Sequence, residues 1–422
     1  MSSSVRMNQF ILKLISVCEV RPTERSLIEE RFDRVLVTDD FSKKYYQDNF
    51  FTEFREFMYP TPQKEEQTFA FYERELSELA YIHDGCTFSL SKAELVYTPS
   101  QLGIFSVTVT TDVSDLNQMT MLLSSLRSFD RKIETVNPPQ AETEAEELTL
   151  SRVIEEEVLG FNFRRNSIAD LYSGSKFKMF LVGEHSDLGG DHELKNLLYD
   201  VATCSAVGSA AGEGYNAPHP DYLETLQPHY LSAFKNYEGL VLLDSFVVMG
   251  QGVLIGPDGQ LNRGKELTWD VTYFRIYVYL LFLKYSLYRF NNLWKEGGDQ
   301  SDYDHFEEFY YRYNISHVSF NFLPQLVHDK IREGIEVDQE LLLFKERMKR
   351  LNELESELQS KKNSRFLKIA SIAIMIASVP WSDLYDFFTK VHVSPTIAFS
   401  VIFLLMLLGV VGVHLYNRWN ER

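Results

Sequence analysis

Cysteine is scarce in this sequence, and so is positive charge. Cys18, Cys86 and Cys204 lie far apart among 422 residues and form no CxxC pair, which excludes a disulfide framework and a zinc ribbon. Acidic residues outnumber Lys and Arg by 60 to 42, and the formal net charge is -18. We therefore expect no direct nucleic-acid partner, because neutralising phosphates requires a basic face.

Familiar catalytic signatures are missing as well. No HExxH motif, no Ser-His-Asp order, no P-loop Lys-Ser/Thr and no pair of catalytic carboxylates can be singled out, so we do not expect an enzyme. An apolar patch at Phe10–Val17 is interrupted by Lys13 and is not followed by a small-residue cleavage site, so we expect no signal peptide. With 45% hydrophobic and 24% charged residues the chain is not mostly disordered.

The C-terminal part is rich in long apolar runs. Val391–Asn417 holds 27 consecutive residues without Asp, Glu, Lys or Arg, and a bilayer core needs about 20. This predicts a transmembrane helix at 396–416, after an outer loop at 389–395 and before a cytoplasmic tail at 417–422. A weaker run predicts a first transmembrane helix at 366–388, with an interfacial or re-entrant helix as the alternative.

Basic residues flank both predicted spans. Their positions before the first span and after the second place both termini in the cytoplasm of a multi-pass protein. In the first span, residues at spacings of three and four form a polar stripe, which predicts pore-lining residues with two acids at the outer mouth; close packing of small residues is the alternative. The stripe is Lys368, Ser371, Met375, Ser378 and Ser382, and the outer acids are Asp383 and Asp386.

A long helix is predicted just upstream. Glu336–Lys362 contains no Gly or Pro, and a stripe of three-four spacing runs along it: Leu341, Phe344, Met348, Leu351, Glu355 and Leu358. We therefore predict a stalk helix at 336–365 that continues to Phe388, about 75 Å in total at 1.5 Å per residue. An ordinary surface helix packed on its own domain is the alternative.

The rest of the chain reads as α/β. We predict an N-terminal α/β region at 1–136, an acidic linker or loop at 137–150, and a second α/β part with aromatic-rich helices at 151–335. Strands are expected at Glu94–Thr98, Gly103–Thr110 and Leu240–Val248. The aromatic run Thr268–Trp294 contains Arg and Lys, so we expect a helix buried between layers and not a third span.

This order of elements resembles the CorA family of divalent-cation transporters. The resemblance implies a CorA-like funnel: an α/β cytoplasmic domain, a long stalk helix and two C-terminal transmembrane helices, assembled as a homo-oligomer, commonly a pentamer. The family's Gly-Met-Asn signature would fall where this chain has Ser378-Val-Pro-Trp381, so no ligand role is transferred and magnesium selectivity is in doubt.

Divergent members that depart in this way include the CorA-like membrane effectors found beside type III CRISPR systems. That resemblance implies an ion channel or transporter in the inner membrane of a prokaryote, gated in antiviral defence by SAM-AMP, a nucleotide made of S-adenosylmethionine joined to AMP. A constitutive divalent metal-ion transporter and a membrane-anchored binding or scaffold protein are the alternatives. A divalent cation is the implied transported ion, and no covalent cofactor is expected.

Candidate ligand residues are small or basic. Gly208, Gly212 and Gly214 belong to a loop whose small residues would let backbone amides approach a phosphate, although a plain flexible loop is the alternative. Arg164, Arg165, Lys176 and Lys178 are candidates for phosphate contacts in an otherwise acidic region. His185, Asp187, Asp191 and His192 are close in sequence, but Gly189-Gly190 predicts a loop there, and we expect no metal site.

Overall fold

The structure is a computed structural model that divides into two units, Met1–Phe344 and Lys345–Arg422. It describes residues 6–60, 69–136, 148–164, 176–185, 191–213, 217–295, 300–377, 380–392, 394–397, 399–404 and 407.

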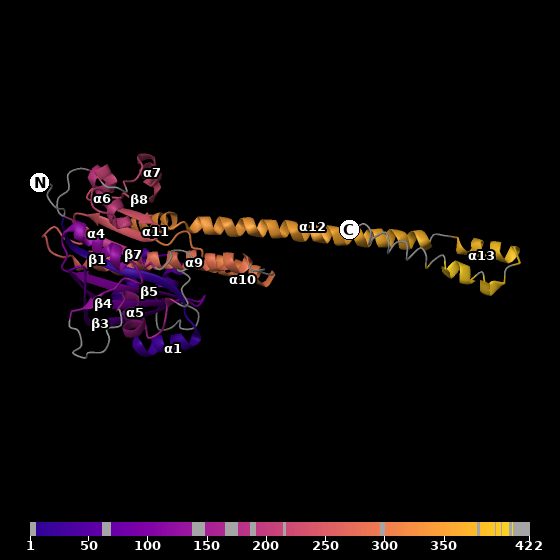
Figure 1. The fold of residues 1–422 in the computed structure, drawn as a ribbon, viewed down its shortest axis with the longest axis horizontal. Coiled ribbons are helices and arrows are strands. Elements are labelled where there is room, and N and C mark those ends of the chain that lie inside the picture. The colour runs from indigo at the N-terminus through magenta and orange to yellow at the C-terminus, as the bar shows by residue number, and fades with distance from the viewer. Residues whose placement is uncertain are drawn as a thin grey trace. The chain divides into compact units, whose positions relative to one another are not determined.

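A ten-stranded sheet forms the centre of the first unit (Figure 1). The strands follow the order β2-β3-β4-β5-β1-β7-β10-β9-β8, and β6 pairs with β3. Neighbouring strands are antiparallel except β7 and β10, which are parallel. Their bounds are β1 Met7–Glu19, β2 Asp33–Val35, β3 Ala70–His83, β4 Cys86–Tyr97, β5 Leu102–Thr111, β6 Glu134–Thr135, β7 Lys178–His185, β8 Tyr230–Leu231, β9 Tyr237–Leu242 and β10 Ser245–Gly250.

The apolar patch near the N-terminus is a central strand. β1 pairs with β5 on one side and β7 on the other. Residues 11–18 are all buried, so the alternating side chains of β1 enter two separate layers, one on each face of the sheet.

The predicted strands Glu94–Thr98 and Gly103–Thr110 correspond to β4 and β5, which pair as an antiparallel hairpin. Gly103 in β5 leaves room for Val20, because a Cβ there would come within 2.5 Å of Val20 Cγ2.

Helices cover both faces of the sheet. On one face, Leu12, Leu14, Phe105 and Leu181 join a core with α4, α5, the π-helix η1 and α6. On the other face, Phe180 and Phe246 pack on α9, with ring centroids 5.2 and 6.0 Å from Phe274 and Tyr277 respectively. The helices are α1 Pro22–Arg31, α2 Asp40–Asn49, α3 Thr52–Met58, α4 Leu116–Leu126, α5 Leu150–Val153, η1 Ile154–Leu159, α6 Asp191–Thr203, η4 Ser209–Glu213, α7 Pro220–Thr225, η5 Gln227–His229, α8 Arg263–Leu267, η6 Thr268–Tyr273, α9 Phe274–Lys295, α10 Gln300–Tyr313 and α11 Phe322–Gly334.

The predicted aromatic-rich helix is confirmed. α8, the π-helical η6 and α9 follow one another without a break from Arg263 to Lys295. Tyr277, Tyr279 and Tyr285 are among the largest fully buried side chains. Asn262 caps the start, since its side chain accepts hydrogen bonds from the N–H groups of Gly264 and Lys265.

The second unit contains most of α12 (Val337–Ala377), which begins in the first unit, and α13 (Trp381–Lys390). Among the residues that the structure describes, no helix has both the length and the apolar character that a bilayer crossing requires. The expected transmembrane helices at 366–388 and 396–416 are therefore wrong, and so are the membrane and ion-channel assignments, the CorA-like funnel and the multi-pass inner-membrane location.

The ends of α12 and α13 explain why the region differs from the predicted transmembrane helix at 366–388. α12 stops at Ala377, ahead of Pro380, so the predicted continuous rod from Glu336 to Phe388 is broken. The next helix, α13, carries Asp383, Asp386 and Lys390, and is amphipathic over only 10 residues. Of the predicted second span, positions 398, 405–406 and 408–416 lie outside the described residues.

The predicted pore-lining residues lie on both sides of this break. Lys368 and Ser371 are exposed on α12, and the Ser371 hydroxyl donates to the carbonyl of Leu367 at 2.7 Å. Met375 is in α12 and Ser378 lies outside the described residues. The remaining three, Ser382, Asp383 and Asp386, are exposed on α13. The predicted pore-lining role required the transmembrane span at 366–388, so it is lost together with that span.

Candidate functional site

The glycine loop predicted to bind phosphate is already occupied by a side chain of the protein. Asp200 on α6 accepts hydrogen bonds from the N–H groups of Gly208 and Ala210, both at 2.8 Å. Burial raises the pKa of Asp200 to about 6, although these backbone donors act in the opposite direction. Gly212 lies in η4 with a φ of 87°, and Gly214 lies outside the described residues. These amides hold the protein's own loop.

The predicted basic residues have separate partners. Arg164 donates to Glu155 at 3.0 Å and to Asp130 at 3.2 Å. Lys178 is buried in β7 and donates to the carbonyl of Leu243 at 3.0 Å; burial lowers its pKa to about 8. Lys176 is exposed beside Ser128. Arg165 lies outside the described residues.

The four residues considered for a metal are also spread over separate elements. His185 ends β7, Asp187 lies outside the described residues, and Asp191 and His192 begin α6. Among those of the sequence-predicted ligand residues that the structure describes, no common site is formed.

A candidate site is a pocket of about 520 Å³ between α8, η6, the segments that flank β9 and β10, and the first turn of α11. We call it the aromatic pocket. Its aromatic wall is made of Phe234, Tyr237, Trp269 and Tyr273, and its polar groups are Asn236, Asn262, Lys265 and Thr268. Its size and its apolar lining with a few polar groups are typical of small-molecule sites.

The aromatic wall is continuous. The Trp269 and Tyr273 ring centroids are 4.5 Å apart, those of Tyr237 and Trp269 are 6.1 Å apart, and those of Phe234 and Tyr237 are 5.2 Å apart. Burial raises the pKa of Tyr237 to about 12 and that of Tyr273 still further, so both phenols are neutral. Phe234 remains 47% exposed, which leaves a ring at the mouth of the pocket.

The π-helical turn η6 explains why these residues meet. Trp269 and Tyr273, four residues apart, both line the aromatic pocket. Asp270 and Val271 of the same turn line a second cavity instead. Insertion of a π-helical turn changes the direction of the side chains that follow it, and such turns are frequent at functional sites. η6 therefore contributes to both cavities.

Lys265 supplies the positive charge in the aromatic pocket. Its Nζ donates to the carbonyl of Gly252 at 2.6 Å and to that of Ile255 at 3.0 Å. Among the ion pairs of the described residues, none includes Lys265. A half-buried ammonium group held only by carbonyls keeps its full positive charge, so an anion in the pocket would form an ion pair with it.

The second cavity, about 230 Å³ in volume, lies between β2–β4 and η6–α9. We call it the charged pocket. Beneath it Lys13, fully buried, pairs with Glu94 and, at 2.9 Å, with Asp270. Lys92 pairs with Glu73 at 2.7 Å. Burial alone would raise the pKa of Glu94, but Lys13 and Lys92 outweigh it and hold that pKa below its usual value. These charges are satisfied by one another.

α9 connects the aromatic pocket to the start of α12. It begins directly after Tyr273 and passes the α11–α12 junction, where Lys284 donates to the carbonyl of Ile335. Further along, the Asn291 amide donates to the main-chain carbonyl and the carboxylate of Glu340, both at 3.0 Å. A rigid helix thus joins the aromatic wall to the first turns of α12.

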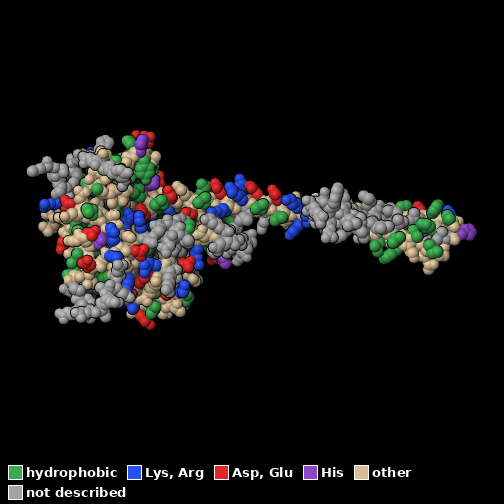
Figure 2. Space-filling model, in the orientation of Figure 1, with side chains coloured by type: hydrophobic (Ala, Val, Ile, Leu, Met, Phe, Trp, Pro, Cys, Tyr) green, Lys and Arg blue, Asp and Glu red, His purple; other side chains and the backbone are tan. Residues whose placement is uncertain are grey.

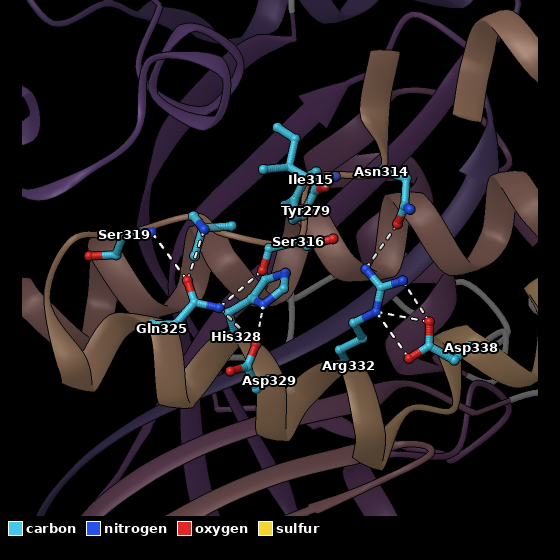
Figure 3. A network of polar contacts seen from close by, with 11 residues as sticks. Tyr279, Asn314, Ile315, Ser316, Ser319, Gln325, His328, Asp329, Arg332 and Asp338 are labelled. Carbon is cyan, nitrogen blue, oxygen red and sulfur yellow. Dashed lines mark hydrogen bonds and ion pairs between the residues drawn. The ribbon is translucent and has the colours of Figure 1, made fainter. Parts of the chain in front are cut away.

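α11 forms a second connection (Figure 3). Leu323 in its first turn lines the aromatic pocket. Two residues later, Gln325 accepts from the N–H of Val318 at 2.9 Å and donates to the carbonyl of Ser316 at 3.0 Å. Toward its end, Arg332 holds Asp338 of α12, with Nη2 and Oδ1 2.6 Å apart.

His328 occupies the middle of this network (Figure 3). It is fully buried, its Nδ1 lies 2.9 Å from an oxygen of Asp329, and its ring centroid lies 6.2 Å from that of Tyr279 on α9. Burial lowers the pKa of His328 even though Asp329 acts in the opposite direction. His328 therefore links α11 to α9, while Arg332 makes the contact between α11 and α12.

No family model matches the chain, and no curated protein or solved structure matches it significantly. The resemblance to CorA transporters stays a prediction. Figure 2 shows acidic and basic side chains intermixed over the described face of the first unit, without one large basic area. The pocket residues themselves could have been noticed in the sequence only as Trp269 and Tyr273 at helical spacing, with Lys265 one turn earlier.

Proposed function

We propose that this chain is a nucleotide-responsive sensor, which binds its ligand in the aromatic pocket and conveys occupancy to α12. The single observation that carries the proposal is the pairing of an aromatic wall with Lys265 in one pocket. A nucleotide presents a planar base and an anionic phosphate. Stacking on aromatic rings and a charge-assisted hydrogen bond from Lys265 are the interactions that these two parts require.

The two helices that leave the pocket support the sensing role. A ligand moves an equilibrium only when it contacts two conformations differently. Trp269 and Tyr273 lead into α9, and Leu323 is part of α11, so a ligand in the pocket would contact both helices that reach α12. A change in their relative position would alter the Arg332–Asp338 and Asn291–Glu340 contacts.

Titration calorimetry on the full chain tests the binding. AMP supplies a base, a ribose and one phosphate, and SAM-AMP is the larger ligand that the CorA-like resemblance implies. We expect saturable binding of a nucleotide, and we expect Phe234→Ala to weaken it about tenfold, because stacking one base on an aromatic ring contributes about 1–3 kcal/mol.

Tyr222→Ala is the matched control. Tyr222 on α7 is 49% exposed, close to the 47% of Phe234, and it does not line the aromatic pocket. Its removal should leave the affinity unchanged. The proposal fails if neither nucleotide binds, or if the two alanine variants weaken binding equally.

A further inference from the structure

The loop after β10 is held between two opposite charges. On its inner side, Glu184 at the end of β7 accepts hydrogen bonds from the N–H groups of Gly252 at 2.8 Å, Ile255 at 2.7 Å and Leu254 between them. On its outer side, Lys265 donates to the carbonyls of Gly252 and Ile255. The same two residues therefore bind the anion with their N–H groups and the cation with their carbonyls.

Burial makes this arrangement electrostatically significant. Glu184 is only 3% exposed, so water screens its charge weakly. Its negative charge lies behind the loop, and the positive charge of Lys265 lies in front of it. The carboxylate holds the loop in the shape that seats Lys265, and it also reduces the positive potential that Lys265 presents to the pocket.

Gly252 fits this role. It has a φ of +73°, and a Cβ on it would meet Asn236 Nδ2 at 3.4 Å and Lys265 Nζ at 3.9 Å. A left-handed residue is most easily a glycine. The conformation lets one residue face both charges at once.

We propose that Glu184 is a positioning residue that sets the preference of the aromatic pocket for anionic over neutral ligands through Lys265. The inference rests on the proposed function. An anionic ligand draws Lys265 away from the two carbonyls, whereas a neutral ligand leaves it in place. The charge of Glu184 opposes the first event and does not affect the second.

The measured quantity is the ratio of AMP affinity to adenosine affinity, since adenosine lacks only the phosphate. Glu184→Gln keeps the side-chain size and removes the charge, so we expect the ratio to rise several-fold. Glu184→Asp keeps the charge, and the ratio should stay near that of the unaltered protein. A purely structural role predicts instead that Glu184→Gln loses affinity equally for both ligands, so that the ratio stays unchanged.

Lys265→Met provides the second arm. It should lower AMP affinity about tenfold to a hundredfold, the usual contribution of a hydrogen bond to a charged group, and leave adenosine affinity unchanged. Lys43→Met is the control, because Lys43 is a half-buried lysine of α2 that does not line the pocket. This arm remains informative if Glu184→Gln does not fold.

Hydrogen exchange without ligand separates the inference from the proposed function. The amides of Gly252, Leu254 and Ile255 should exchange faster in Lys265→Met than in Lys43→Met, because the loop then loses one of its two holds. If AMP and adenosine both fail to bind, the proposed function fails. The exchange experiment then tests on its own whether Lys265 helps to hold the loop after β10. Unchanged exchange, or an affinity ratio that stays the same or falls in Glu184→Gln, overturns the inference.

Discussion

The two cavities on either side of η6 use charge in different ways. The charged pocket balances its own ions, since Lys13 pairs with Glu94 and Asp270. The aromatic pocket leaves Lys265 with two carbonyls as its partners. Paired ions hold elements together, whereas a cation without a carboxylate partner is available to a ligand. We therefore expect the charged pocket to stabilise the fold, and we propose ligand binding for the aromatic pocket only.

The largest effect should come from the charged pocket. Lys13→Met removes a fully buried cation and leaves Glu94 and Asp270 without their central partner. Breaking one side of a buried ion pair costs about 3 kcal/mol of unfolding free energy. Urea unfolding of Lys13→Met and of the unaltered protein measures this loss of unfolding free energy. The assignment is wrong if Lys13→Met changes nucleotide affinity and leaves the unfolding midpoint in place.

A smaller effect should depend on pH. Because the pKa of Glu94 is lowered in the folded protein, its ionised form stabilises the fold above the unfolded value of about 4.3. That contribution is lost as the pH falls through the folded pKa. The difference in melting temperature between the unaltered protein and Glu94→Gln should therefore be largest near neutral pH and shrink below about pH 4.3. A difference that stays constant to pH 3 would contradict the ion-pair account.

The smallest effect is expected at the rim of the same pocket. Glu73 pairs with Lys92, but its side chain is 41% exposed, and water screens such a pair. Glu73→Gln should cost about 0.5 kcal/mol or less in urea unfolding. A loss as large as that of Lys13→Met would show that burial does not decide the ranking.

Local patterns in the sequence predicted much of the first unit. The strands at Glu94–Thr98 and Gly103–Thr110 and the buried aromatic helix at Thr268–Trp294 follow from local residue patterns, and the structure contains them as parts of β4, β5, η6 and α9. The run Leu240–Val248 was read as one strand, yet it is a hairpin: β9 ends at Leu242 and β10 begins at Ser245. Only Asp244 and Ser245 interrupt the apolar run, and both strands are mostly buried, so no alternation marks the turn.

The candidate site could not be predicted in the same way. Phe234, Trp269 and Leu323 come from three distant segments, and only tertiary packing brings them together. The glycine loop looked open because the sequence does not show that Asp200 occupies its amides. The membrane helices were inferred from apolar runs alone, whereas α12 ends at Ala377 and the polar α13 follows.

The most direct test of the sensor account is hydrogen exchange across α11 and the first turn of α12, with and without saturating AMP. The account predicts changed protection around Gln325, Arg332 and Asp338 as well as in the aromatic pocket, and the loss of both changes in Phe234→Ala. A change confined to the pocket, with α11 and α12 unaltered by bound nucleotide, would contradict it.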